Sequence, residues 1–179
     1  MDQAARPGVV VRAYRHEDCS VVQQIERRAG ERFREVGLDL VADHHPPDYR
    51  VLSSYELLGR AWVASDGDDR PVGYLLIEVL DGSPHIEQVS VDPDHQGRGV
   101  GRALVEQAVR WAIERGSALL TLNTYRDFVP WNAPLYRHLG FAEIDPETLG
   151  PELKAQCARE AAIGLEPALR VTMGMQLPP

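Results

Sequence analysis

Apolar residues recur along this chain with two different periods, which together predict an α/β (α+β) domain. Strand-like alternation, or a short apolar run bounded by turn residues, occurs over 9–14, 61–65, 71–80, 85–91, 118–123, 141–144 and 170–176. Apolar residues at helical spacing occur over 17–35, 49–58, 100–115, 132–139 and 149–164. Adjacent prolines make 41–47 a loop. The pattern therefore predicts about seven strands with flanking helices.

The bulk composition fits one ordinary globular domain over 1–179. With 44% apolar and 26% charged residues, the chain has the composition of a folded protein rather than a disordered one. The net charge of −8 and the lack of a basic block argue against nucleic acid or a membrane as partner. No apolar run reaches the roughly 18 residues that span a bilayer, and the first residues lack a signal-peptide core. We therefore expect a cytoplasmic protein.

Cysteine and histidine spacing predicts no metal site. Cys19 and Cys157 are too few for a disulfide framework and have no ligand spacing. His44 and His45 are adjacent, but no third ligand stands at a recognisable distance. We interpret both histidines as solvated loop residues.

The segment 89–102 carries the clearest chemical signal. An apolar strand and a turn lead into glycines at 97, 99 and 101, where the lack of a Cβ lets the backbone approach a ligand. The helix that follows offers free N–H groups and the positive end of its dipole. Arg98 and Arg102 add formal positive charge. These features predict a site for a phosphate-bearing ligand.

The spacing of the glycines excludes two known types of phosphate-binding loop. A P-loop requires lysine after its last glycine, where Arg102 stands, and the dinucleotide fingerprint fails whether it starts from Gly97 or Gly99. What remains is Gln96-x-x-Gly99-x-Gly101. In this pattern the chain resembles the GNAT-type N-acetyltransferases, whose loop of this form holds the pyrophosphate of acetyl-coenzyme A (acetyl-CoA). The alternative is a glycine-rich turn that merely caps the helix.

The resemblance implies a GNAT fold, with a mixed, mostly antiparallel sheet whose fourth and fifth strands splay apart. It implies that acetyl-CoA is the co-substrate and that its pantetheine arm pairs with the backbone near Val89 and Val91. It covers about 8–145 well and the last helix and strand, 149–176, loosely. The residues that it assigns to the pyrophosphate are Gln96, Gly97, Arg98, Gly99, Val100, Gly101 and Arg102.

Glu87 is the candidate general base for removing a proton from an acceptor amine. It shares its parity in the strand with Val89 and Val91, so we expect the three side chains on one face. Partial burial would raise the pKa of its carboxyl toward neutrality. The alternative is a solvent-facing glutamate. His85 has the same parity and either extends a proton relay or is an edge-strand histidine, which we slightly favour.

Tyr136 is the candidate general acid. Together with Gly140-Phe141 it matches the end of the family's second motif, in which the tyrosine lies near the coenzyme A sulfur. The alternative is a tyrosine that packs beside Phe141. The family's asparagine position is Val129 here, whereas Asn132 stands one helical turn before Tyr136 and is a candidate contact to the cofactor arm. The resemblance also implies that the backbone N–H of residue 89 or 91 stabilises the oxyanion.

The resemblance places the acceptor between the first two helices and the segment after the fifth strand. The expected reaction is acetyl transfer from acetyl-CoA to a primary amine of a small molecule or a peptide, by direct attack in a ternary complex. The alternative is a non-catalytic acyl-CoA sensor. Dimerisation is common in the family, so we consider a homodimer through 171–173 as well as a monomer. Acceptor-side candidates are Phe33, Asp39, Asp43, His44, His45, Tyr49, Tyr125, Arg126, Asp127 and Phe128.

Overall fold

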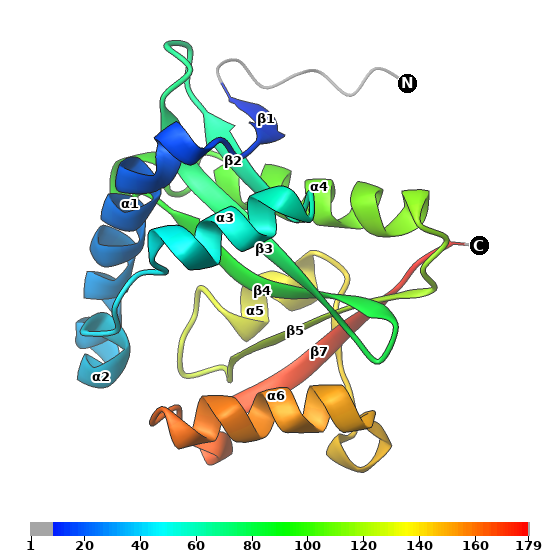
Figure 1. Cartoon of the computed structure of the whole chain (residues 1–179). Helices are drawn as coiled ribbons and strands as arrows, with labels where there is room; N and C mark the ends of the chain where they lie inside the picture. The colour runs from blue at the N-terminus through cyan, green and yellow to red at the C-terminus, as the bar shows by residue number, and fades with distance from the viewer. Residues whose placement is uncertain (1–8, 179) are drawn as a thin grey trace.

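The computed structural model describes residues 9–178, which form one mixed sheet with helices on both faces (Figure 1). The seven strands follow the order β1-β2-β3-β4-β5-β7-β6, and only the β4–β5 pair is parallel. The predicted fold class is therefore confirmed. The strands are β1 (Val10–Ala13), β2 (Ala61–Ser65), β3 (Pro71–Leu80), β4 (Ser83–Val91), β5 (Leu119–Tyr125), β6 (Ala142–Glu143) and β7 (Arg170–Gln176).

The helices form a layer on each face of the sheet (Figure 1). One layer contains α1 (Cys19–Glu31), α3 (Tyr49–Leu57) and α6 (Pro151–Ala162), and the other contains α4 (Val100–Glu114) and α5 (Ala133–His138). No helix within the described range 9–178 is long and apolar enough to cross a membrane.

The structure corrects two predicted segments near the N-terminus. The helix predicted over 17–35 divides into a 3-10 turn, α1 and a second 3-10 segment, η2 (Arg32–Val36), which ends at Gly37 with φ +76°. The loop predicted over 41–47 begins later than expected, because a short helix, α2 (Asp39–Ala42), precedes it. One turn of helix has too few residues to show a period, so the pattern could not reveal it.

β3 is the centre of the core because both of its faces are buried. Leu75 and Ile77 belong to the cluster that packs against α4, whereas Tyr74 and Leu76 belong to the cluster under α1 and α3. Full burial of each such side chain stabilises the fold by about 1.5–3 kcal/mol. Burial on both faces explains the nearly continuous apolar run in this strand.

Gly73 lets the start of α4 approach the sheet closely. A Cβ at this position would lie 3.0 Å from Ser90 O and 3.1 Å from side-chain carbons of Val100 and Leu104. Any larger residue would therefore push α4 away from β3 and β4. This contact fixes the helix N-terminus, and with it the glycine loop, against β4.

β4 and β5 pair at only one end. His85 pairs with Thr121 and Ile86 with Leu122, and no further register pairs join the two strands. Beyond that point β5 continues to Tyr125 alongside β7, while β4 continues to Val91 alongside β3. The splay that the resemblance implied is therefore present.

β7 is an interior strand rather than the strand that closes the sheet. It lies between β5 and β6, and Val171, Thr172 and Met173 are buried within the chain. These three residues cannot form the dimer surface suggested by the sequence. The strand predicted over 141–144 contains β6, but nothing in its pattern indicated that it would pair with β7 and cover it.

Candidate functional site

The splay leaves one edge of β4 without a strand partner. The Asp92 N–H donates to Val72 O, so the antiparallel alternation turns the backbone of Gln88 and Ser90 toward β3. The backbone groups of Val89 and Val91 consequently point toward the β5 side, where pairing has already ended at Ile86. An extended, amide-bearing ligand could pair there as a short extra strand.

The glycine loop follows directly and exposes the N-terminus of α4. Gly97 and Gly99 have φ values of +73° and +86°, a region that favours glycine. The first intrahelical hydrogen bond is that from the Ala103 N–H to Gly99 O, at 3.0 Å. The N–H groups of Val100, Gly101 and Arg102 precede it and therefore have no acceptor within the helix. Free N–H groups at the positive end of a 15-residue helix fit a phosphate.

Arg98 and Arg102 flank this helix start on the surface. Both are exposed, and Arg102 makes a half-exposed ion pair with Glu106 at 3.1 Å. Such a pair contributes little to stability, so it would compete only weakly with a phosphate for the guanidinium. Both positions fit the predicted pyrophosphate contact.

Gln96 uses its side chain within the protein. Its Nε2 donates to Val91 O at 3.2 Å, and its Oε1 accepts from Arg32 of η2 at 3.1 Å. The Arg32 guanidinium also stacks over the Trp131 ring, 3.8 Å from the centroid. Gln96 and Arg32 thus connect the glycine loop to β4, η2 and the β5–α5 loop, and any pyrophosphate contact by Gln96 would use its backbone N–H.

Glu87 lies at a β-bulge in the middle of β4. Leu76 pairs with Gln88 and Ile77 with Ile86, so Glu87 has no partner on β3. The extra residue changes the alternation of side chains. Val89 therefore packs against the α4 cluster, whereas the Glu87 carboxylate accepts from Gln156 of α6 at 3.1 Å. The predicted common face for Glu87, Val89 and Val91 is wrong, because parity does not carry across a bulge.

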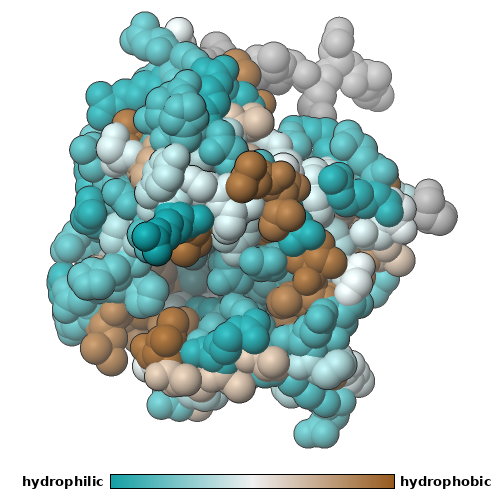
Figure 2. Space-filling model, viewed as in Figure 1, coloured by the Kyte–Doolittle hydropathy of each residue, from teal (hydrophilic) through white to brown (hydrophobic). Residues whose placement is uncertain are grey.

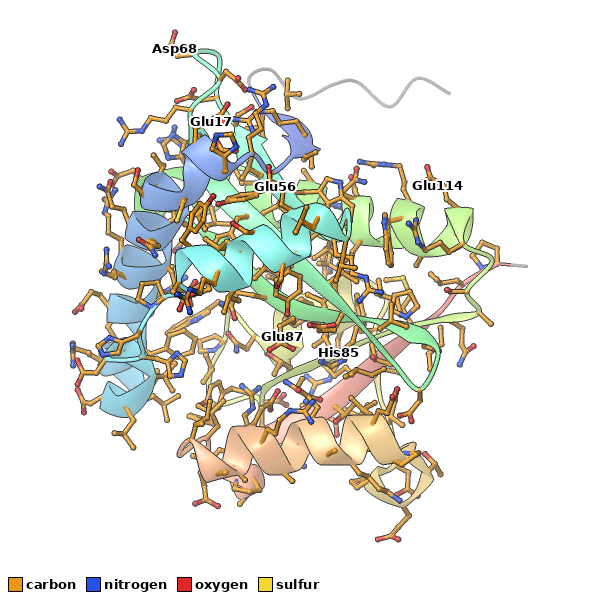
Figure 3. All side chains as sticks on the ribbon, viewed as in Figure 1. Glu17, Glu56, Asp68, His85, Glu87 and Glu114 are labelled. Carbon is orange, nitrogen blue, oxygen red and sulfur yellow. The ribbon has the colours of Figure 1, made fainter. Side chains whose placement is uncertain are left out.

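The environment of Glu87 suits a general base near neutral pH. The pKa of its carboxyl is raised from 4.5 to about 7, chiefly by burial and then by the neighbouring Glu160 and Glu78 carboxylates, while the hydrogen bond from Gln156 and the charge of Arg159 oppose the rise. A base is most effective when its pKa lies close to the working pH. In Figure 3, Glu87 lies centrally, between α3 and α6.

His85 is a buried residue of an interior strand, not an edge-strand histidine. Its side chain is 1% exposed, and its Nδ1 lies 2.8 Å from Thr121 Oγ1. Burial lowers the pKa of the imidazole to about 4. His85 is therefore neutral at physiological pH, and its only hydrogen-bond partner among residues 9–178 is a threonine that ties β4 to β5.

Tyr136 lies on α5, on the α4 side of the sheet. Its ring packs edge-on against Phe141 with centroids 5.8 Å apart, and burial raises the pKa of its hydroxyl to about 12. Asn132 is the N-cap residue of α5, and its carbonyl accepts from the Tyr136 N–H at 3.1 Å. Val129, at the family's asparagine position, is fully buried and forms part of the core.

An aromatic cluster joins η2 to the end of β5. The Phe33 ring centroid lies 5.8 Å from that of Tyr125 and 5.9 Å from that of Trp131, and Tyr125 also contacts Phe128. The structure thus brings together Phe33 and the segment 125–128, as the acceptor-side prediction required. Trp131 is an additional member of this cluster.

The acidic candidates on this side are already paired. Asp43 and Asp39 lie 2.5 and 3.3 Å from the Arg34 guanidinium, and Asp127 contacts Arg137. His44 and His45 are exposed, and no group of three metal-ligating side chains occurs within 9–178. These three ion pairs are exposed, whereas Glu87 of β4 accepts from the Gln156 amide instead of an arginine.

Figure 2 shows a hollow on the face that carries α1, α3 and α6, above α6 in that view. A cavity of about 310 Å³ beside the glycine loop is lined by Arg28, Arg32 and Gln96, among others. A second, of about 370 Å³, lies against α6 and includes Cys157, Glu160 and Arg170 in its lining. Glu87 lines neither cavity.

Sequence reasoning missed the polar residues that surround the candidate base. Gln156 and Glu160 stand one turn apart on α6, and Glu26 of α1 accepts hydrogen bonds from Tyr74 and Gln88. The spacing of Gln156 and Glu160 in an otherwise small-residue helix was a weak signal for an inward polar face. Nothing in the sequence indicated which strand that face would meet.

The fold and site are those of an acyltransferase scaffold, and comparison with known proteins identifies its family. The acetyltransferase (GNAT) family model matches residues 22–141. The chain therefore belongs to the GNAT acetyltransferase family and is an acyltransferase.

Individual relatives act on different acceptors. The chain is 31% identical over 111 residues to the peptidyl-lysine N-acetyltransferase YjaB of Escherichia coli, spanning 59% of this chain and 67% of that protein. It is 35% identical over 83 residues to the streptothricin acetyltransferase of Streptomyces lavendulae, spanning 45% and 42%. The PaiA N-acetyltransferase of Thermoplasma acidophilum, solved with coenzyme A, has the same fold, with a TM-score of 0.69 at 12% identity over 94% of this chain and 98% of that one.

The raised pKa of Glu87 predicts a pH-dependent effect on stability. Below about pH 4.5 the carboxyl is protonated in both folded and unfolded chains, whereas above about pH 7 both are ionised and the folded state bears the cost of burying the charge. Glu87→Gln should therefore raise the melting temperature progressively between pH 4.5 and 7 and most strongly above pH 7. Glu114→Gln, at an exposed end of α4, is the control for loss of one carboxylate. A Glu87→Gln effect that is the same at pH 4 and pH 8 would contradict the raised pKa.

Proposed function

We propose that this protein transfers an acetyl group from acetyl-CoA to a primary amine by direct attack in a ternary complex. One observation carries the proposal: the edge of β4 at Val89–Val91, which has no strand partner, leads into the free α4 N-terminus, with a partly buried carboxylate at the bulge just before it. The edge fits the amide-bearing pantetheine arm and the helix start fits the pyrophosphate. Family membership and the coenzyme A complex of PaiA support this assignment.

When bound, acetyl-CoA supplies an activated thioester, so the chain needs no covalent nucleophile. Glu87 takes the proton from the acceptor ammonium and holds it on a carboxylate oxygen while the amine forms the new C–N bond. With a pKa of about 7, the ionised and protonated forms of Glu87 are both accessible near neutral pH. The Val89 and Val91 N–H groups, facing the β5 side, are the oxyanion donors in this proposal.

Tyr136 acts on the leaving group as the C–S bond breaks. Its hydroxyl donates a hydrogen bond to the departing thiolate, which then takes its proton from solvent. The pKa of about 12 keeps the phenol protonated at working pH, so the donor is always in place. Because an ordinary thiol has a pKa of about 8.5, Tyr136 stabilises the thiolate chiefly as a hydrogen-bond donor rather than as a strong acid.

The proposed function is tested by free-thiol release from acetyl-CoA across small amines, amino acids, aminoglycosides and lysine-bearing peptides. We expect turnover with one acceptor class, with mass spectrometry showing the acetyl group on its amine. Glu87→Gln should abolish turnover, while Glu114→Gln should leave it unchanged. Tight coenzyme A binding without transfer to any acceptor would favour the sensor alternative over the enzyme reaction proposed here.

Removing the two loop arginines should weaken coenzyme A binding. Arg98→Ala with Arg102→Ala deletes two charges beside the predicted pyrophosphate site, and we expect at least a tenfold rise in Kd by calorimetry, equivalent to about 1.4 kcal/mol. The charge-matched control is Arg27→Ala with Arg50→Ala, two exposed residues on α1 and α3. Equal affinities for the two double variants would remove the arginines from the site.

Tyr136→Phe separates the leaving-group role from packing. The ring remains to contact Phe141, so we expect Kd for acetyl-CoA to stay within about twofold while kcat falls roughly a hundredfold, in the range for loss of a proton donor. A kcat equal to that of the wild type would exclude the hydroxyl from the mechanism.

A further inference from the structure

Helix α6 presents polar side chains to the sheet beside the proposed base. It lies in the connection between β6 and β7, and Glu160 on its inner face is fixed to both neighbouring strands. Its carboxylate accepts from Asn123 of β5 at 3.0 Å and from Arg170 of β7 at 2.8 Å. The side chains of Glu160 and Arg170 are only 14% and 17% exposed. Such a shielded, multiply bonded pair has a defined geometry, unlike a surface ion pair.

Gln156, one turn earlier, connects this pair to Glu87. It is 8% exposed, and its Nε2 lies 3.1 Å from Glu87 Oε2 and 3.3 Å from Glu160 Oε1. Its Oε1 accepts from the Arg159 guanidinium at 2.6 Å. An amide nitrogen has two hydrogens, so one can go to each carboxylate while the oxygen faces the cation. The three partners together determine the orientation of the amide.

The other charged groups near Glu87 come from the sheet and α3. Glu78 of β3 raises the pKa of Glu87, and Glu78 itself accepts from Tyr55 of α3 at 2.7 Å and lies 3.5 Å from Arg60. His85 of β4 is neutral. Glu87 is thus placed between two carboxylates, with Gln156 as its hydrogen-bond donor and Arg159 as the nearest favourable charge.

We propose that Gln156 is a positioning residue that orients the Glu87 carboxylate. In this proposal Glu160, held in place by Arg170, supplies a negative charge that disfavours the ionised form of Glu87. This inference rests on the proposed role of Glu87 as general base. A glutamate at a bulge has no strand partner to restrict it, and ordering a long side chain costs up to about 1.5–2 kcal/mol of rotamer entropy. The Gln156 amide provides that order, which makes α6 part of the catalytic apparatus.

Two variants should move the pH profile of kcat/KM in opposite directions. Gln156→Leu removes the donor that favours ionised Glu87, so the midpoint of the rising limb should move up by about half a pH unit or more, which lowers kcat/KM at pH 7 about twofold or more. Glu160→Gln removes a repelling charge, so the midpoint should move down by a similar amount. Gln24→Leu on the exposed side of α1 and Glu114→Gln on α4 are the matched controls, with unchanged midpoints.

The midpoints distinguish positioning from support of the fold. A structural role would lower kcat/KM at every pH without moving the limb, and coincident midpoints in all variants would overturn the inference.

If Glu160→Gln fails to fold because Arg170 loses its partner, Gln156→Glu replaces it and should move the midpoint further upward than Gln156→Leu does. An inactive wild-type protein would overturn the proposed function instead. In that case NMR titration of the Glu87 carboxyl still tests the contact, since equal pKa values in wild type and Gln156→Leu would refute it.

Discussion

The rest of the site depends on the point where β4 and β5 stop pairing. Two pairs, at His85 and Ile86, hold the strands together at one end, and the buried contact between His85 and Thr121 reinforces that end. Beyond Ile86 the backbone of β4 still needs partners, and unpaired strand edges are costly unless water or a ligand satisfies them. The sheet is therefore incomplete at its centre. The close packing of α4 against the strands at Gly73 stabilises it on one face.

The sequence was sufficient to predict most of the architecture, because the elements that matter are long and strongly patterned. The apolar run of β3, the amphipathic α4 and the glycine loop each have a local cause that can be read from residue order. The short helix α2 was lost for the opposite reason, because it has too few residues to establish a period. The strand at 141–144 was predicted, but its pairing with β7 was not, so the dimer surface suggested for 171–173 failed.

The site was predictable in part. Glu87 and Tyr136 were candidates from their places in strand and motif, and the structure puts one near each face of the splayed sheet. The bulge at Glu87 was not predictable, because a single extra residue leaves no mark in the pattern of 85–91, and it reverses the side-chain parity on which the facing argument depended. Gln156 and Glu160 could not be connected to Glu87 either, since that pairing arises only when residues about 70 positions apart fold together.

The position of α6 outside the main packing has a further consequence. No residue of α6 belongs to either hydrophobic cluster, although Leu153 is buried, so polar contacts such as those of Gln156 and Glu160 form a large part of the attachment of the helix to the sheet. Regions with few buried apolar contacts open locally at a lower free energy than the core. Because Gln156 reaches Glu87 from this helix, local opening of α6 would break the hydrogen bond to the proposed base while the contacts that hold α4 against the sheet remain.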